Sequence, residues 1–394
     1  MRAGFAFLLL AYGLSQFFRA MLAVLAPALE AEIGATAGDL ARASGWWFAV
    51  FAAMQLPIGW ALDRIGPRRT TAGLFALGAG GGAALFATAH SPAAVTLAMA
   101  LIGAGCAPVL MASFFIFARV YPPAVFASLA GLLIGLGSLG NLAAAAPTAW
   151  AAEAFGWRAT LWGVAALSLA AAAGLFALVR DPGPSPAPPE GAGGLGALLR
   201  IPALWLMVPL LIFNYAPAAG VRGLWAGPYL RDVFGLDAGA IGLVTLWMAV
   251  AMILGNFAYG PADRILRTRK WVLVGGNLAT VAALLALGLA PASGVLAAGL
   301  LLAAVGFFGS SFPLVMAHAR SYYPPHLVGR GVSFANLLSI GGVGALQFAS
   351  ARVFDARIAA GAPPEAAYGA LFLFFAALLA AGLVVYLFAE DRLD

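Results

Sequence analysis

The chain has 394 residues, of which 63% are hydrophobic and 9% charged, and its formal net charge is +6. A soluble protein of this length carries about 25% charged residues because its surface faces water, so this composition excludes a soluble fold and indicates a membrane protein. The low polarity excludes a disordered chain, the single cysteine excludes a disulfide scaffold, and the basic excess fits cytoplasmic loops better than a nucleic-acid partner.

A helix that crosses a bilayer needs about 20 mostly apolar residues. Runs of that length occur twelve times and predict an all-α membrane protein with twelve transmembrane helices, for which the lipid bilayer is a partner. The first run is interpreted as a retained helix and not as a signal peptide. The predicted spans are 4–28, 43–62, 70–90, 94–118, 125–150, 158–180, 203–229, 239–261, 271–290, 294–318, 329–352 and 367–389.

The orientation follows from the basic residues, which accumulate in cytoplasmic loops. With the N-terminus inside, fourteen of the 21 basic residues fall in cytoplasmic loops or tails and five fall in external loops. The remaining two, Arg19 and Arg222, fall inside predicted helices. The count predicts that both termini are cytoplasmic.

The most proline-rich stretch separates the sixth predicted span from the seventh. Residues 181–200 are predicted to form a cytoplasmic linker between a six-helix bundle at 1–180 and a second one at 201–394. The two bundles repeat at an offset near 200, because Asp63-Arg64-Ile65 returns as Asp263-Arg264-Ile265. Duplication of a six-helix unit explains this pattern most simply.

The loop after the second predicted helix runs from Gly59 to Arg69 and reads GWALDRIGPRR. It resembles the loop signature of the major facilitator superfamily, which is glycine, three residues, then Asp-Arg-x-Gly-x-Arg-Arg; the copy at Asp263-Arg264 is looser. The resemblance implies two six-helix bundles that face each other, a small-molecule site near the midplane between them, and alternating access by rocking.

We interpret this repeated loop as a conformational latch, in which a glycine allows close helix approach and charges at helix ends pair in one state only. The alternative is an anchor that follows the positive-inside rule. Proteins of the superfamily pair the loop with an acid at the end of helix 4, where this chain has Phe117-Ala118-Arg119. The predicted latch residues are Gly59, Asp63, Arg64, Arg68, Asp263 and Arg264.

A charge at the bilayer centre costs at least about 2.5 to 3.5 kcal/mol, so the two arginines inside spans are functional candidates. Arg19 follows Tyr12 by seven residues, and Arg222 follows Tyr215 by seven, which is two helical turns and one shared face. Their offset of 203 matches the repeat and predicts that they lie on opposite walls of the central cavity. All 15 acids fall in predicted loops, tails or helix edges, so no acid inside a span can neutralise the two guanidiniums. We therefore expect them to bind an organic anion.

The segment around Arg19, which precedes Pro27 by eight residues, resembles the organophosphate and organic-anion branches of the superfamily, where an arginine so placed contacts substrate. The helix 7 match is poorer, because Arg222 precedes Pro228 by six. Glycines in helix 7 would let it unwind and re-aim Arg222; the alternative is that Arg222 snorkels to the external face. The predicted substrate contacts are Arg19, Arg222, Tyr12, Tyr215, Gln16, Asn141 and Asn336.

The sequence favours a secondary transporter of a small organic anion, either a carboxylate or a phosphorylated compound, with exchange or uniport preferred over proton symport. The alternatives are an efflux carrier for amphipathic or hydrophobic compounds and a non-transporting sensor on the same fold. No catalytic triad, metal cluster or nucleotide loop is found, so an enzyme, a metal and a cofactor are not expected.

Composition and aromatic positions give two smaller expectations. Twenty arginines against one lysine suggest a GC-rich bacterial genome and therefore the bacterial inner membrane, where we expect a monomer. Trp46, Trp47, Trp225 and Trp247 are interpreted as an interfacial aromatic belt, with the wall of the outer cavity as the alternative.

Overall fold

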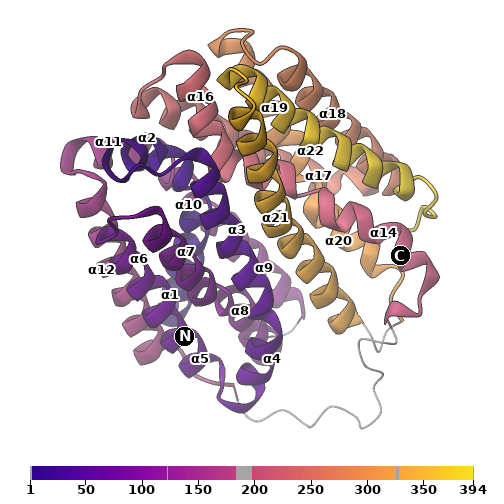
Figure 1. The fold of residues 1–394 in the computed structure, drawn as a ribbon. Coiled ribbons are helices and arrows are strands. Elements are labelled where there is room, and N and C mark those ends of the chain that lie inside the picture. Colours follow the sequence, from indigo (N-terminus) through magenta and orange to yellow (C-terminus); the bar gives the residue numbers. More distant parts are fainter. Residues whose placement is uncertain (1, 122, 183–197, 325–327, 394) are drawn as a thin grey trace. The chain divides into compact units, whose positions relative to one another are not determined.

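The computed structural model describes residues 2–121, 123–182, 198–324 and 328–393. Internal contacts divide the chain into two compact units, Met1–Pro186 with Asp237–Leu243 and Ala187–Leu236 with Val244–Asp394. Most of the predicted linker at 181–200 lies outside the described residues, so the predicted domain boundaries stay a prediction. The helices of both units are drawn in Figure 1.

The first unit consists of helices, and the described residues contain no β-strand. A π-helical segment, η1, interrupts its third span. The helices are α1 (Arg2–Phe18), α2 (Leu22–Ile33), α3 (Ala37–Ala53), α4 (Gln55–Arg64), α5 (Pro67–Leu74), η1 (Phe75–Gly80), α6 (Gly81–Ala87), α7 (Pro92–Cys106), α8 (Pro108–Val120), α9 (Pro123–Gly137), α10 (Leu139–Ala143), α11 (Ala146–Phe155) and α12 (Trp157–Leu178).

The second unit is helical as well, and its first span is broken into four pieces, one of which, η2, is π-helical. A short 3-10 segment, η3, interrupts a later span. The helices are α14 (Pro202–Phe213), α15 (Ala216–Gly220), η2 (Val221–Trp225), α16 (Ala226–Phe234), α17 (Ala238–Leu266), α18 (Lys270–Leu289), α19 (Val295–Phe308), η3 (Gly309–Ser311), α20 (Phe312–Arg320), α21 (Val328–Ala359) and α22 (Pro364–Tyr386).

Among the described residues, nine helices are long and apolar enough to cross a membrane, and three bent pairs pass the same test together. The all-α class with nine to twelve spanning helices is thereby confirmed, and each of the twelve predicted spans coincides with one of these helices or pairs. Several helices continue past the predicted ends. For example, α2 continues to Ile33 and closes at Gly34, whose φ of 66° suits a residue without a side chain.

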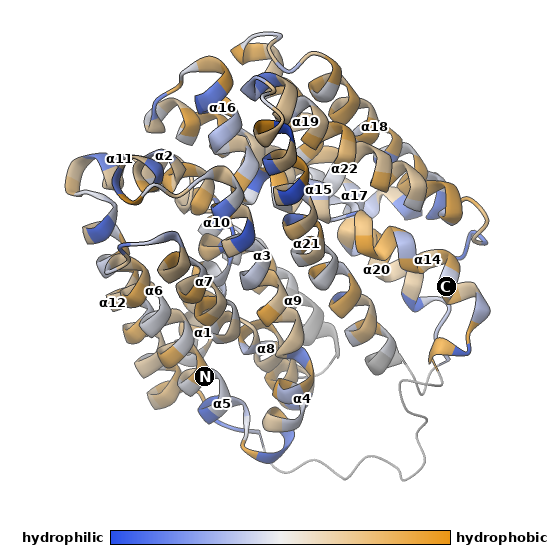
Figure 2. Ribbon diagram, in the orientation of Figure 1, coloured by the Kyte–Doolittle hydropathy of each residue, from blue (hydrophilic) through white to orange (hydrophobic). Residues whose placement is uncertain are grey.

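Large apolar side chains lie exposed on helices of both units, as they do in a protein that faces lipid. Leu77 in the first unit is 78% exposed, and Leu296 in the second is 77% exposed. Figure 2 shows hydrophobic residues along most of the helices and hydrophilic ones mainly at helix ends and loops. In water this exposure would drive association, whereas in a bilayer it is the solvated state.

Small residues set the distance between α3 and α7. A Cβ atom built on Gly103 would lie 2.3 Å from the main-chain oxygen of Trp47, so these two helices touch backbone to backbone. Close approach through glycine is the usual route to tight packing in membranes, where lipid tails give no hydrophobic drive for helices to associate. This contact fixes the position of Trp47.

We predict that Gly103→Ala lowers the stability of the protein by about 1 to 3 kcal/mol, because the added methyl group cannot fit without moving α3. The measurement is the melting temperature of the purified protein in detergent. The matched control is Gly163→Ala in α12, where a Cβ atom would meet nothing within 4 Å and where alanine favours the helix. Equal melting temperatures for the two variants would contradict the packing described here.

Candidate functional site

Arg19 lies at a break in the first span. Helix α1 ends at Phe18, helix α2 begins at Leu22, and the two are bent by 53°. Between them, the main-chain N–H groups of Ala20 and Met21 both donate to the carbonyl of Phe17, at 3.0 and 3.2 Å. The predicted continuous helix therefore holds its arginine on a turn, where the side chain is half-buried.

Two aromatic rings of α3 hold the Arg19 guanidinium. Its central carbon is 5.1 Å from the ring centroid of Trp47 and 5.0 Å from that of Phe51. The two rings are four residues apart and stack with centroids 5.0 Å apart and planes inclined by 19°. Such contacts stabilise a cation by about 0.5 to 2 kcal/mol, more as water is removed, so the rings fix the charge without neutralising it.

Two buried donors in this cluster have no acceptor. The Arg19 Nε atom and the Trp47 Nε1 atom are both buried, and neither makes a hydrogen bond within the described residues. No acid among the described residues is paired with Arg19. A buried donor without a partner costs about 1 to 3 kcal/mol, which a bound acceptor would recover. We call Arg19, Trp47 and Phe51 the arginine–aromatic cluster.

The other predicted contacts of the first unit are Tyr12 and Gln16 of α1 and Asn141 of α10. The Gln16 amide donates to the Tyr12 hydroxyl at 2.9 Å, and both residues are buried. The Tyr12 ring packs on α9, where a Cβ atom on Gly137 would lie 2.1 Å from it. Asn141 is half-buried in α10.

Arg222 lies in the π-helical segment η2 and is only 4% exposed. The irregularity that glycines predict in the seventh span, 202–234, is therefore present, and the Arg222 side chain does not reach the surface. Tyr215, at the break between α14 and α15, is close enough to interact electrostatically with Arg222. Asn336 in α21 is half-buried, and its side-chain amide makes no hydrogen bond within the described residues.

Trp225 and Trp47 are fully buried, so the interpretation of these two as an interfacial belt is wrong. The Trp225 indole N–H donates to Gln347 and to Ser350, both at 3.0 Å, because η2 packs on α21. Trp46 and Trp247 are 48% and 61% exposed, as a belt requires. Sequence spacing alone does not separate these two environments.

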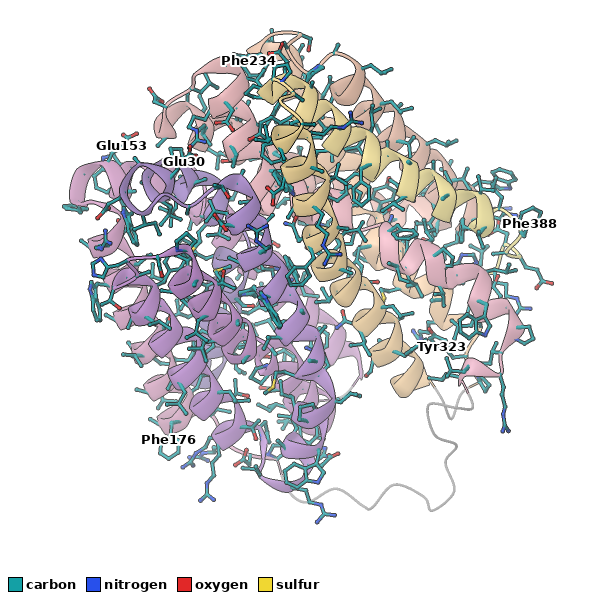
Figure 3. The ribbon with its side chains drawn as sticks, in the orientation of Figure 1. Glu30, Glu153, Phe176, Phe234, Tyr323 and Phe388 are labelled. Atoms are coloured by element: carbon teal, nitrogen blue, oxygen red, sulfur yellow. The ribbon has the colours of Figure 1, made fainter. Side chains whose placement is uncertain are left out.

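The loop signature of the first unit contacts α8 and α12 through its charged side chains. The Arg119 guanidinium of α8 donates to the Asp63 carboxylate at 3.3 Å, so the loop aspartate pairs with an arginine near the end of the fourth span. The Arg68 guanidinium lies 4.6 Å from the ring centroid of Phe176, which Figure 3 labels. Arg64 is exposed. Within the first unit no atom lies within 4 Å of a Cβ on Gly59, so packing in this unit does not require that glycine.

The second copy of the loop pairs within itself. Asp263 is buried and bonds to Arg269 at 2.9 Å. Both line a pocket of about 510 Å³, together with the exposed Arg264, Arg267 and Arg320. The pocket is therefore basic, as a cytoplasmic loop of a membrane protein often is.

In each unit an acid that follows the last span caps the start of the third span. Sequence reasoning did not predict these caps. The Asp181 carboxylate accepts from the main-chain N–H of Arg68 at 2.7 Å, at the start of α5. Asp391 accepts from the main-chain N–H groups of Arg269 and Lys270 at 3.0 and 2.9 Å, at the start of α18. The two acids are 210 residues apart, close to the repeat offset, and that spacing was the available signal.

We predict that Asp391→Asn removes an acid-sensitive part of the stability. Burial alone would raise the pKa of Asp391, but hydrogen bonds from Thr268 and from the main-chain N–H groups of Lys270 and Arg269 outweigh it and lower the pKa. The cap is therefore complete above the ordinary pKa of aspartate, about 3.9, and is lost as the pH falls through the lowered value. The measurement is the melting temperature from pH 7 down to pH 3.

Because Asp391 is largely exposed, the expected loss at pH 7 is at the low end of a cap, about 0.5 to 1 kcal/mol. The matched control is Glu153→Gln, an exposed carboxylate in α11. If the melting temperature of Asp391→Asn falls between pH 7 and pH 3 as steeply as that of the wild type, Asp391 does not cap α18.

Comparison with known proteins gives the family. The sequence matches the Major Facilitator Superfamily over residues 8–348, and no curated protein matches the chain. Among solved structures, the chain is similar to a bacterial homolog of the human lysosomal transporter Spinster in an inward-facing and occupied conformation, at 19% identity and a TM-score of 0.73. That match covers 98% of this chain and 96% of the other.

Two further structures are similar over nearly their whole length. A D-xylose-proton symporter matches at 15% identity with a TM-score of 0.75, covering 99% of this chain and 98% of that one. A nucleoside transporter matches at 13% identity with a TM-score of 0.78, covering 98% and 99%. Identities this low show the fold alone. With its profile match over most of the sequence, the chain belongs to the Major Facilitator Superfamily and is a multi-pass integral membrane transporter, not an enzyme.

Proposed function

We propose that this protein is a secondary transporter of a small organic anion, a carboxylate or a phosphorylated compound, which it moves by alternating access. The arginine–aromatic cluster carries the proposal. A guanidinium in a membrane-spanning segment without an acid partner binds an anion more strongly than it would in water, because the surroundings screen the attraction less. Its planar donors suit carboxylate or phosphate oxygens.

The cluster also supports selection by geometry. Trp47 and Phe51 hold the Arg19 guanidinium between helix α3 and the break, so little side-chain freedom is lost when an anion binds. The indole N–H of Trp47 is a second buried donor beside the charge. One oxygen-rich anion would satisfy both residues. An apolar efflux substrate would leave both donors unsatisfied, so the structure gives that alternative no support.

Arg222 is our proposed anion contact in the second unit, with Tyr215 and Asn336 as further contacts there and Tyr12, Gln16 and Asn141 as those of the first unit. The π-helical segment supports a role for Arg222, because π-bulges within helices are frequent at functional sites. Arg222 lies 203 residues after Arg19, close to the offset between the two halves of the sequence. We therefore propose that both arginines contact the transported anion.

The mode of transport follows from the acids. Proton coupling through a side chain needs a titrating acid in the membrane-spanning path. Asp63 and Asp263, the acids of the repeated loop, each pair with an arginine, and no described acid pairs with Arg19. We therefore favour anion exchange or uniport. The loop pairs would break and re-form as a latch during the cycle, in a monomer whose two termini face the cytoplasm of a bacterial inner membrane.

We predict that Arg19→Gln abolishes anion binding. The purified protein is titrated with oxalate, succinate, glycerol 3-phosphate, nitrate and tetraphenylphosphonium, and the melting temperature is followed, because a ligand of the folded state raises it. One carboxylate or phosphate ester should stabilise the wild type and the control Arg200→Gln, an exposed arginine far in sequence from the cluster. Arg19→Gln should weaken that anion at least about tenfold.

Arg19→Lys refines this test, since lysine keeps the charge but loses the planar fork, and intermediate binding is expected. The anion that binds is then assayed for counterflow in proteoliposomes. Stabilisation by tetraphenylphosphonium alone, or an unchanged anion response in Arg19→Gln, would overturn the proposed function.

We predict a smaller, separate effect for Trp47→Phe. Phenylalanine keeps a ring for Phe51 and Arg19 but removes the indole N–H, so the same anion should bind about threefold to tenfold more weakly. Trp46→Phe, an adjacent exposed tryptophan on α3, is the control and should bind as the wild type does. Equal affinities for the two variants would exclude Trp47 as an anion contact.

A further inference from the structure

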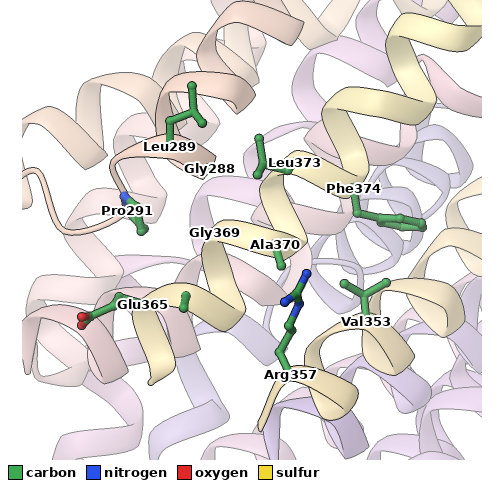
Figure 4. A pocket seen from close by; sticks show the side chains of 11 residues that line it. Gly288, Leu289, Pro291, Val353, Arg357, Glu365, Gly369, Ala370, Leu373 and Phe374 are labelled. Atoms are coloured by element: carbon green, nitrogen blue, oxygen red, sulfur yellow. The ribbon is translucent and has the colours of Figure 1, made fainter. Parts of the chain in front are cut away.

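A groove of about 640 Å³ opens on the second unit, away from Arg222 in sequence and outside the proposed function. It lies where α18 ends, α21 ends and α22 begins, as Figure 4 shows. Leu289, Val353, Leu373 and Phe374 line it with apolar side chains. Gly369 of α22 approaches the main chain of α18 so closely that a Cβ atom there would lie 2.8 Å from the oxygen of Gly288.

Two opposite charges line the same groove without neutralising each other. Arg357 near the end of α21 and Glu365 near the start of α22 are both exposed, and no ion pair or hydrogen bond engages either side chain within the described residues. In Figure 4 the Arg357 side chain reaches toward Ala370, whereas the Glu365 carboxylate points away from it. The groove therefore presents a separated cation and anion beside an apolar wall.

The depth of the groove in the membrane follows from the helix ends. Helices α18, α21 and α22 all contain candidate membrane spans. The groove spans the last residue of α18, Leu289, and the first turn of α22, and Arg357 is two residues before the end of α21. Helix ends of spanning segments lie where the hydrocarbon core meets the lipid headgroups. The charges lie at headgroup level, and Leu373 and Phe374 lie more than two helical turns deeper along α22 than Glu365.

We propose that this groove is a binding site for a glycerophospholipid with an ethanolamine headgroup. The lipid phosphate accepts from Arg357, the primary ammonium donates to Glu365, and an acyl chain covers Leu289, Leu373 and Phe374. A zwitterion complements a separated cation and anion, whereas an anionic headgroup such as glycerol phosphate meets the unpaired carboxylate of Glu365. A choline headgroup has no N–H to donate to that carboxylate.

The test uses the full-length protein, delipidated in detergent and titrated with phosphatidylethanolamine, phosphatidylcholine and phosphatidylglycerol of identical acyl chains. Native mass spectrometry counts the lipids bound. Phosphatidylethanolamine should bind about tenfold more tightly than either of the others. Arg357→Gln should weaken all three lipids, and Glu365→Gln should reduce phosphatidylethanolamine to the level of phosphatidylcholine while leaving the other two unchanged or tighter.

The matched control is Arg352→Gln, an exposed arginine of α21 that does not line the groove. Both groove residues are exposed, and equal melting temperatures of the variants confirm that they fold. Unchanged phosphatidylethanolamine binding in Arg357→Gln, or binding of phosphatidylglycerol as tight as that of phosphatidylethanolamine, would overturn the proposal. Neither result depends on the transported anion, so this site and the proposed function succeed or fail separately.

Discussion

A guanidinium in a membrane-spanning segment needs either a counter-ion or a replacement for water, and the first unit is organised around this requirement. The chain breaks its first span at Arg19 and places two stacked rings of α3 against the charge. Those rings stand where they do because Gly103 lets α7 approach α3 backbone to backbone. Cation–π contact orients the charge but does not cancel it. The remaining attraction is available to a ligand.

The repeated loops after the second span of each unit use their acids in the same two ways. In each, an acid that follows the last helix closes the start of the third helix, and the loop aspartate pairs with an arginine. A helix N-terminus carries partial positive charge and unsatisfied N–H groups, so an acid stabilises it. The partners of Asp63 and Asp263 nevertheless differ, since one comes from α8 and the other from the loop itself. The two units therefore share the acid caps but not the partners of the loop aspartates.

Apolar run length was enough to predict the spanning helices, because water, lipid and the main chain leave few alternatives. The described residues contain nine such helices, or twelve if each bent pair counts as one span. The break at Arg19 was not predictable from local signals, since residues 17–22 contain neither proline nor glycine. The burial of Trp47 was missed because a tryptophan near a span end fits an interface equally well. The Arg119 partner of Asp63 needed a long-range contact. Sequence reasoning thus found the charge and missed the residues that surround it.

The π-helical turn at Val221–Trp225 changes how the arginine-to-proline spacing of the seventh span compares with that of the first span. A π turn accommodates one extra residue, and one residue corresponds to about 100° of rotation in an α-helix. The difference of two residues between the Arg19–Pro27 and Arg222–Pro228 spacings therefore no longer translates into opposite faces. Loss of the π turn would rotate Arg222 about the axis of the seventh span relative to the residues on either side of the turn. The π turn thus sets which side of the seventh span the buried Arg222 faces.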